Sequence, residues 1–330
     1  MEPVIDVVIP TYRPDARLLQ IFDMLERQTL RVRAIRIINT EQPLFEKLLE
    51  EQGLDEKALA EKFPEVSVRH IDKVSFDHGG TRNLGVSLCT GADFCLLMTQ
   101  DALPSGEDLV EKLYAPMVRD ETLAVSYARQ LPNPGERKAE VFSRAFNYPE
   151  ESRVKSEEDF ATLGIKTYFC SNVCALYRKS VLDALGDFPS PMIFNEDMVF
   201  AGRALKAGCR IRYTAEALVY HSHHYSAGQQ FHRNFDLGVS QAMHPEIFAK
   251  ASSEGEGMHY VKAVISYLQK NGGRSEIPGF VATCGARLVG YRLGKKYKKL
   301  PKRLVLSLTS NPTFFKAHPE VFLDSFTENS

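Results

Sequence analysis

Strand-like segments recur along the first hundred residues of the chain, and the last of them is an unbroken apolar run that ends in polar and turn residues. They lie at 4–10, 34–38, 66–71 and 94–98. Between them, apolar residues recur at three- and four-residue spacing, which predicts amphipathic helices. This alternation predicts an α/β fold with a mostly parallel, Rossmann-like sheet and helices on both of its faces.

Capping and turn residues predict where the helices between these strands begin and end. A charged helix is expected from residue 44 to about 62, after the second strand. A further helix is expected to start at Thr81 as its N-cap and to end before Gly91. Residues 105–108 resemble a capping box, which predicts a helix after the fourth strand.

The second half of the chain is less regular. Residues 131–168 are rich in charged and turn residues, and we expect a partly helical excursion over the mouth of a crevice. A strand at 172–177 and a helix at 197–207, closed by Gly208, are predicted next. A short strand is expected at 210–213.

The pattern from residue 227 onward is helical, and a loose linker at 252–255 interrupts it. A chain of 330 residues can bury one good core with a smaller appendage. We therefore predict an α/β domain over 1–225 and a helical C-terminal extension over 226–330.

Composition excludes several classes of protein. Hydrophobic residues make up 44% and charged residues 25% of the chain, as in ordinary soluble globular proteins. The formal charge of −1 argues against a dedicated nucleic-acid binder. The first residues lack the basic head and apolar core of an export signal, and no apolar run approaches the roughly 20 residues that span a bilayer. These observations predict a cytoplasmic protein.

Six cysteines occur without any CxxC spacing, which favours reduced core thiols over a disulfide framework. Cys170 and Cys174, together with histidines, are an alternative zinc-ligand set.

A polar turn, Thr99-Gln100-Asp101, follows the apolar strand at 94–98 directly. The carboxyl ends of such strands open onto the ligand crevice of α/β sheets. Asp101 is therefore placed to hold a divalent cation or a sugar hydroxyl. The alternative is a turn aspartate before Pro104.

Two further groups of polar residues follow in the chain. Glu196 and Asp197 come at the start of a predicted helix, where they could act as a general base and its neighbour or could merely complement the helix dipole. His221, His223 and His224 occupy three of four positions after a strand-like segment, and we expect a functional role for at least one of them. The alternative for His221 is a buried, hydrogen-bonded core histidine.

The order of these motifs resembles that of the GT-A glycosyltransferases of family two, which are inverting nucleotide-sugar enzymes. Within them, the chain looks most like the bacterial rhamnosyltransferase group. The closer likeness rests on SFDHGGTRN at 75–83, TQDALP at 99–104 and VYHSH at 219–223. The resemblance covers about residues 4–225, and it implies the GT-A fold for that part.

The resemblance implies roles for the acidic and histidine groups. Asp197 would be the general base that deprotonates the acceptor, with Glu196 as an acceptor-orienting neighbour. Asp101 and His221 would hold a divalent metal ion, Mn²⁺ or Mg²⁺, that stabilises the diphosphate leaving group. One imidazole ligand favours Mn²⁺ over Mg²⁺.

The donor nucleotide sugar would be bound at the ends of the first strands, through residues implied by the same likeness: Thr11, Tyr12, Asn39, Asp77, Arg82, Gln100 and Asp101. Gly79 and Gly80 would let the backbone approach a ligand closely, and Arg82 would pair with a phosphate or with Asp77. Two positions depart from the family pattern. Thr99 replaces the first carboxylate of its Asp-x-Asp motif, and Asn39 stands where an aspartate often reads the base.

The acceptor pocket is expected within 131–195, with Tyr148, Phe169 and Asn172 as candidate contacts. By likeness to the rhamnosyltransferase group, the donor would be dTDP-L-rhamnose and the acceptor a growing cell-surface polysaccharide on a lipid carrier. The alternatives are a UDP- or GDP-sugar donor, a metal-dependent phosphohydrolase, and a non-catalytic sugar-nucleotide sensor.

The segment 295–303 carries six cations in nine residues and precedes the apolar residues 304–306. It is either a solvated basic face or a peripheral contact with the anionic inner face of the cell membrane. A lipid-linked acceptor would give the second interpretation a purpose.

Overall fold

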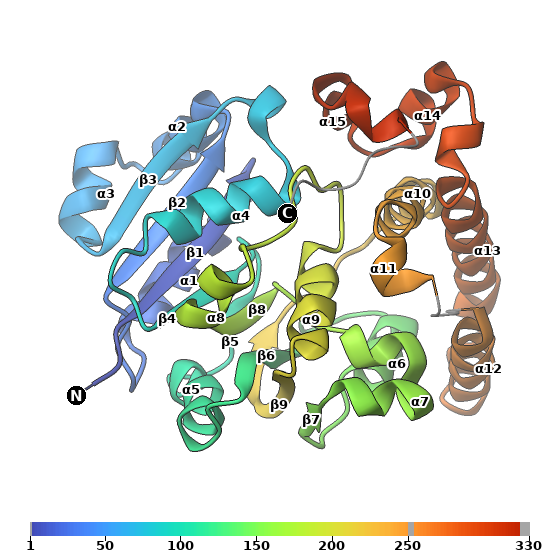
Figure 1. The fold of residues 1–330 in the computed structure, drawn as a ribbon, viewed down its shortest axis with the longest axis horizontal. Coiled ribbons are helices and arrows are strands. Elements are labelled where there is room, and N and C mark those ends of the chain that lie inside the picture. Colours follow the sequence, from blue (N-terminus) through green and yellow to red (C-terminus); the bar gives the residue numbers. More distant parts are fainter. Residues whose placement is uncertain (1, 250–253, 324–330) are drawn as a thin grey trace.

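A nine-stranded sheet forms the centre of the structure, which is a computed structural model that describes residues 2–249 and 254–323 (Figure 1). The strands follow the spatial order β3-β2-β1-β4-β8-β6-β9-β5, and β7 pairs with β9. Their bounds are β1 Ile5–Tyr12, β2 Ala34–Thr40, β3 Val66–Ile71, β4 Phe94–Met98, β5 Leu103–Pro104, β6 Leu123–Leu131, β7 Arg153–Lys155, β8 Cys174–Arg178 and β9 Arg210–Tyr220.

The first four long strands form the parallel half of the sheet. β1 pairs in parallel with β2 on one side and with β4 on the other, and β2 pairs in parallel with β3. These are the four strands that the apolar runs predicted, with β1 and β2 each two residues longer at the carboxyl end. Their carboxyl ends therefore lie along one edge of the sheet, as expected for a ligand crevice.

The second half of the sheet is mixed. β8 lies antiparallel between β4 and β6, whereas β6 and β9 are parallel. β9 is much longer than the predicted strand at 210–213. The prediction ended too early because exposed polar residues such as Glu216 interrupt the apolar pattern. The pairing of Leu103 with Tyr220 joins β5 to the end of β9. This pairing brings the turn after β4 next to the histidine segment.

Helices cover both faces of the sheet, and alternate residues of each central strand face opposite apolar clusters. Val7 of β1 belongs to the cluster that includes α1, α2 and α5, whereas Val8 belongs to the cluster that includes α4, α8 and α9. The fold class predicted from the sequence is therefore observed. These helices are α1 Arg17–Glu26, α2 Gln42–Glu51, α3 Glu56–Lys62, α4 His78–Ser87, α5 Leu109–Arg119, α8 Lys179–Ala184 and α9 Glu196–Lys206.

Three helix boundaries differ from the predictions. The charged stretch at 44–62 forms two helices, α2 and α3, because Gly53 adopts a φ of 67° between them. Helix α4 begins at His78 and not at Thr81, since Asp77 is its N-cap. The capping box at 105–108 does not form, because α5 begins at Leu109 and its N-cap is Asp108 and not Ser105.

The insertion at 131–168 is partly helical, as predicted. It contains α6 (Lys138–Asn147), α7 (Phe160–Leu163) and two 3₁₀ turns, together with strand β7, which the sequence pattern did not predict. Helix α6 packs against α12 of the C-terminal part. The insertion therefore joins the sheet to the C-terminal helices.

The C-terminal part is helical; α12 and α13 lie on the opposite side of the molecule from β1–β3, whereas α15 contacts the 3₁₀ turn Lys73–Ser75 that follows β3 (Figure 1). Its elements are α10 Ala227–Met243, α11 Pro245–Phe248, α12 Glu254–Lys270, α13 Ile277–Gly294, α14 Lys302–Leu308 and α15 Pro312–Ala317. Residues 252 and 253 of the predicted linker lie outside the described residues, and 254 and 255 begin α12. The division into domains at 225 stays a prediction.

Two other observations bear on the expectations from composition. All six cysteines are free, and four of them are buried. Within the described part of the chain, no helix is both long enough and apolar enough to cross a membrane.

Candidate active site

Five of the seven residues predicted to bind the donor, Thr11, Tyr12, Asn39, Gln100 and Asp101, lie where β1, β2 and β4 end, whereas Asp77 and Arg82 belong to the start of α4. Thr11 lies in β1 opposite Asn39 of β2, and its hydroxyl donates a hydrogen bond of 2.9 Å to the side-chain oxygen of Asn39. Gln100 follows β4, accepts from the backbone N–H of Tyr12 and donates to its carbonyl, at 2.9 and 3.0 Å. These hydrogen bonds fix the loop that carries the Tyr12 side chain at the crevice.

The amide of Asn39 makes two further contacts. Its nitrogen donates to the carbonyl of Glu41 at 3.2 Å and lies 3.0 Å from Nδ1 of His70. The phenol of Tyr12 is partly exposed and lies 3.3 Å from the ammonium of Lys73. The structure thus adds His70 and Lys73 to this edge of the sheet. Neither carried a distinctive signal in the sequence.

Asp101, His221 and His223 form a group whose potential ligand atoms lie within 4.8 Å of one another. The Nε2 atoms of His221 and His223 are 3.6 and 3.2 Å from the two carboxylate oxygens of Asp101. The hydroxyl of Thr99 donates to Asp101 at 2.7 Å. Thr99 thus positions the carboxylate from the place where the broader family carries another one.

Gln130 of β6 sets the orientation of the His221 ring. Its amide nitrogen donates to the hydroxyls of Tyr148 and Ser171, at 2.5 and 3.0 Å. Its oxygen accepts from Arg144 at 2.6 Å and lies 2.8 Å from Nδ1 of His221. With the amide held this way, Nδ1 of the neutral ring carries the proton. The lone pair of Nε2 then faces Asp101.

The pKa values at this group favour metal binding over protonation. Burial lowers the pKa of His221 to about 3 and also lowers that of His223, against the opposing effect of Asp101. Burial alone would raise the pKa of Asp101, but His221, Thr99 and His223 outweigh it and lower this pKa. Near neutral pH the group is one carboxylate and two neutral imidazoles.

This donor set fits a divalent cation. Lone pairs of one carboxylate and two imidazoles converge without a proton between them, and such mixed oxygen and nitrogen sets suit Mn²⁺ better than Mg²⁺. A histidine ligand whose other nitrogen donates to a fixed oxygen is the usual arrangement in metal sites. His223 extends the predicted pair of Asp101 and His221 to three. The histidine cluster in the sequence pointed to it, whereas nothing in the sequence pointed to Gln130.

Glu196 and Asp197 lie at the first turn of α9, close to the loop before β8. Asn172 connects them, since its backbone N–H donates to Asp197 and its side-chain amide donates to Glu196, both at 3.0 Å. Arg82 of α4 pairs with Glu196 at 3.1 Å, and both side chains are buried. Arg82 therefore pairs with Glu196, and the alternative pairing with Asp77 is not observed.

The environments of Glu196 and Asp197 shift the pKa values of their carboxyl groups in opposite directions. Burial and the charge of Glu196 raise the pKa of Asp197 to about 7. Burial would also raise the pKa of Glu196, but Arg82, His78 and Asn172 outweigh it and lower this pKa. Asp197 remains partly exposed, whereas Glu196 is buried. The pair thus combines a fixed anion with an accessible carboxyl poised near neutral pH, as a general base requires.

Asp77 caps helix α4 and contacts the chain at 190–192. Its carboxylate accepts from the backbone N–H groups of Gly79 and Gly80 at the start of α4, from the Ser190 hydroxyl and from the Met192 N–H. A Cβ on Gly79 would lie 1.6 Å from the carbonyl oxygen of Pro189. The close approach that these glycines allow is therefore to the chain at 188–192 and not to a ligand.

The three predicted acceptor contacts lie around the catalytic groups. Tyr148 and Asn172 are buried, and each holds a neighbour: Tyr148 accepts from Gln130, and Asn172 donates to both carboxylates. Phe169 is partly exposed and packs edge-on against Tyr148 and Tyr127. Of the three, Phe169 has a side chain that an incoming ligand can reach.

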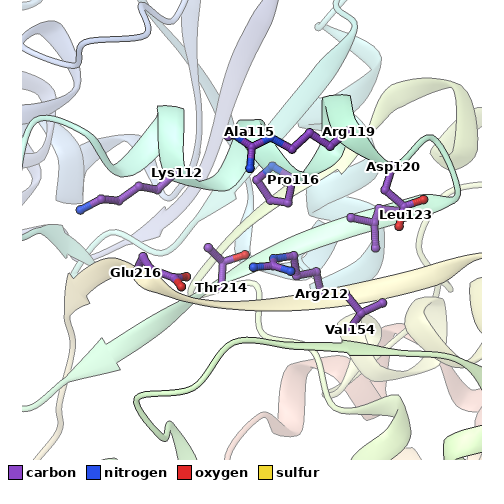
Figure 2. Close-up of a pocket in the computed structure, with 10 residues that line it drawn as sticks. All are labelled: Lys112, Ala115, Pro116, Arg119, Asp120, Leu123, Val154, Arg212, Thr214 and Glu216. Carbon is purple, nitrogen blue, oxygen red and sulfur yellow. The ribbon is translucent and has the colours of Figure 1, made fainter.

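A separate surface pocket of about 340 Å³ lies between α5 and strands β6, β7 and β9 (Figure 2). Its lining includes Lys112, Arg119 and Arg212 but none of the predicted site residues. The candidate site is therefore the edge of the sheet and not this pocket.

Comparisons with known proteins give the relatives of this chain. Residues 6–186 match the family described as glycosyl transferase family 2. The chain is 37% identical over 299 residues to the O-antigen chain rhamnosyltransferase RfbN of Salmonella typhimurium, covering 90% of this chain and 91% of the relative. It is 36% identical over 301 residues to the O-antigen chain rhamnosyltransferase WbaN of Salmonella anatum, with 91% of each chain covered.

Two solved structures share the fold. The mannosyltransferase PcManGT from Pyrobaculum calidifontis, in complex with GDP-Man and Mn²⁺, superposes with a TM-score of 0.53 at 13% identity, covering 99% of this chain and 89% of its own. TarS from S. aureus superposes with a TM-score of 0.52 at 14% identity, covering 97% and 88%. At these identities the likeness concerns the fold alone.

Proposed function

The chain belongs to glycosyl transferase family 2, and from this premise we propose that it transfers L-rhamnose from dTDP-L-rhamnose to a saccharide acceptor with inversion. Glycosyltransferase activity, implied by the sequence motifs, is confirmed by the family match and the relatives, and the GT-A fold is confirmed by the solved structures. Rhamnose as the sugar, and O-antigen-like polysaccharide as the product, are inferred from relatives that match about nine-tenths of the chain.

The proposed reaction is a direct displacement. The acceptor hydroxyl oxygen forms a bond to the anomeric carbon while the bond from that carbon to the diphosphate oxygen breaks, and the diphosphate leaves with the electron pair. Asp197 accepts the hydroxyl proton on a carboxylate oxygen, and Asn172 and Met198 fix that carboxylate through their N–H groups. Glu196, held by Arg82, keeps the pKa of Asp197 high enough for proton transfer near neutral pH.

Asp101, His221 and His223 are proposed to hold a divalent metal ion. When bound, the ion supplies Lewis-acid stabilisation to the diphosphate. Thr99 and Gln130 orient these three side chains before any ligand arrives. The crystallised mannosyltransferase with the same fold contains Mn²⁺, which supports manganese here.

The donor nucleotide is proposed to lie over the ends of β1 and β2. Tyr12 is partly exposed at this edge and Gln100 holds its backbone, whereas Thr11 and Asn39 are buried and support the edge through their hydrogen bond to each other. Arg82 orients Glu196 and is not proposed as a phosphate ligand, because its buried guanidinium is paired inside the fold. Asp77 is likewise not proposed as a donor contact, because its carboxylate caps α4.

The acceptor is proposed to be lipid-linked, which would bring the enzyme to the inner face of the cell membrane. The basic segment at 295–303 supports this contact, since each cation near an anionic bilayer contributes about 1 kcal/mol. Changing its six cations to Gln should abolish sedimentation with anionic vesicles at low salt. Retained sedimentation would contradict the proposed contact of this segment.

The observation that carries the proposal is the convergence of the Asp101 group and the Asp197 pair beside the strand ends. The test is the melting temperature of the protein with Mn²⁺ across a panel of nucleotide sugars. A ligand at 100 times its dissociation constant adds about 2.7 kcal/mol of stability. We expect a shift with dTDP-L-rhamnose that EDTA abolishes.

Two other results would change the proposal. A larger shift with a UDP- or GDP-sugar would keep the activity and replace the donor. Acceptor-independent release of inorganic phosphate would instead indicate a metal-dependent phosphohydrolase, which can use the same carboxylates and histidines.

A further inference from the structure

Helix α13 exposes a continuous stripe of apolar residues along its outer side. The stripe follows helical spacing, and its members are Pro278, Val281, Ala282, Gly285, Leu288 and Val289. Val281, Leu288 and Val289 are 46%, 41% and 51% exposed. These are among the largest exposures of any apolar side chains in the described part of the chain.

The opposite side of α13 is fixed against α10. A Cβ on Gly290 would lie 2.3 Å from the carbonyl oxygen of Phe231, and one on Gly294 would lie 2.0 Å from that of Phe235. These glycines allow the two helix backbones to pack closely, and they fall on the face opposite the stripe. The stripe is therefore held outward by the packing and cannot rotate inward.

The charge around α13 is strongly one-sided. Residues 257–323 contain twelve lysines and arginines but two acidic residues, although the whole chain has a formal charge of −1. Arg292 and Lys296 continue the line of the stripe and are exposed, and the basic segment 295–303 follows at once. An apolar face thus runs directly into a cationic one.

From this juxtaposition we propose that α13 docks on an anionic lipid bilayer, with the apolar stripe in the interface and the cations on the headgroups. An exposed apolar surface next to a basic segment binds bilayers through buried apolar area together with attraction to anionic lipid. A second copy of this chain is disfavoured as the occupant, because it would bring the same cations against this face.

The docking face is joined firmly to the part of the molecule that carries the site. Glu276, just before α13, accepts hydrogen bonds from the backbone N–H groups of Lys138 and Ala139 at the start of α6. The hydroxyl of Tyr260 in α12 lies 2.5 Å from that of Ser143 in α6. Arg144 of the same helix holds Gln130. A docked α13 would therefore hold the crevice at a fixed orientation to the membrane.

This inference deepens the proposed membrane contact but does not depend on the proposed donor or reaction. The test is sedimentation with vesicles of phosphatidylglycerol and phosphatidylcholine, in the absence of any nucleotide sugar. The variant carries Val281→Asp, Leu288→Asp and Val289→Asp together. The matched control carries Val74→Asp and Val118→Asp, at positions 58% and 53% exposed and outside the C-terminal helices.

We expect the α13 variant to bind these vesicles roughly tenfold or more weakly, since three apolar contacts are lost. The control should bind these vesicles as the unchanged protein does. None of the three proteins should bind vesicles of pure phosphatidylcholine. Unaltered binding by the α13 variant would overturn the proposal. So would a concentration-dependent dimer in solution that the α13 variant abolishes, because the stripe would then be a subunit interface.

Two measurements keep this test separate from folding and from activity. The melting temperature of the α13 variant should match that of the control, and Leu288→Gln alone should weaken binding in the same direction if the triple variant does not fold. Sugar transfer to a detergent-solubilised acceptor should persist in the α13 variant. If the unchanged protein showed no sugar transfer, the proposed function would be contradicted, but the vesicle-binding result would still test the docking proposal.

Discussion

The side-chain oxygen of Gln130 lies 2.8 Å from Nδ1 of His221. This contact joins β6 to the end of β9 and determines which nitrogen of the imidazole faces Asp101. Because Arg144, Tyr148 and Ser171 hold the Gln130 amide in turn, the ring is oriented before a ligand arrives. Gln130 is thus a positioning residue for the proposed metal site.

Replacing Gln130 with Ala should weaken Mn²⁺ binding by about 10- to 100-fold, the usual effect of losing the hydrogen-bond partner of a metal-binding histidine. The measurement is Mn²⁺ affinity from isothermal titration or electron paramagnetic resonance. Gln130→Glu, which keeps an acceptor oxygen, should recover much of the affinity. Gln241→Ala removes an equally buried glutamine of α10 and should leave Mn²⁺ affinity unchanged. Equal affinities for all four proteins would contradict the positioning role.

The rate of sugar transfer should rise with pH through about 7. The pKa of Asp197 is raised to about 7, so the carboxylate that accepts the proton is present in the folded protein above this pH and is lost below it. The pH profile of kcat at saturating donor measures this directly. A profile that is flat between about pH 5 and about pH 8 would contradict the assignment of Asp197 as the base.

The same pKa predicts a stability difference. The pKa of Asp197 is higher in the folded chain than in the unfolded one, so its contribution to stability is present at low pH and is lost as pH rises through about 7. Asp197→Asn removes this titration. The melting temperature of the variant minus that of the unchanged protein should therefore increase from about pH 5 to about pH 8. A constant or falling difference would contradict the raised pKa.

Glu196→Gln should move the acidic limb of the pH profile to lower pH, because the negative charge of Glu196 helps to raise the pKa of Asp197. It should also destabilise the protein by about 3 kcal/mol, since Arg82 would lose its partner in a buried ion pair. Kinetics across pH and denaturant unfolding provide the two measurements. An unmoved limb would show that the two carboxyl groups are not coupled.

Asp77→Asn separates a structural role from donor binding. It removes part of the cap of α4 and of the contacts to Ser190 and Met192, so unfolding free energy should fall by about 1 to 2 kcal/mol. The dissociation constant for the donor should stay within about twofold, a small change on the free-energy scale. A large loss of donor affinity with unchanged stability would instead restore Asp77 as a ligand contact.

The parallel half of the sheet was predictable because β1, β2 and β4 are mostly apolar and buried, and because Val66 and Val68 give the edge strand β3 a period-two pattern. The reversal at β8 and the full length of β9 were not, because β9 alternates exposed polar residues such as Glu216 with buried ones. Without knowledge of the strands that pair with it, such a sequence pattern cannot be distinguished from that of a loop. The division of the charged stretch at 44–62 into two helices at Gly53 was not predicted either.

Parts of the site could be predicted because its chemistry depends on local motifs at strand and helix ends. Asp101, His221 and the Glu196–Asp197 pair belong to such motifs, and the structure brings Asp101 and His221 together. Gln130 could not be found, since its role depends on a contact 91 positions away. The family likeness implies donor binding for Asp77, whereas its contacts with 190–192, across more than a hundred residues, leave no trace in the local sequence.

The central claim is tested most directly by the transfer rate of Asp197→Asn compared with that of the unchanged protein. Both proteins would receive dTDP-L-rhamnose, Mn²⁺ and membrane-extracted lipid-linked saccharide, and dTDP release that depends on the acceptor would be measured. Asp197→Asn should transfer the sugar about 10²- to 10⁴-fold more slowly, with donor affinity unchanged. An Asp197→Asn protein that transfers rhamnose at the rate of the unchanged protein would contradict the central claim.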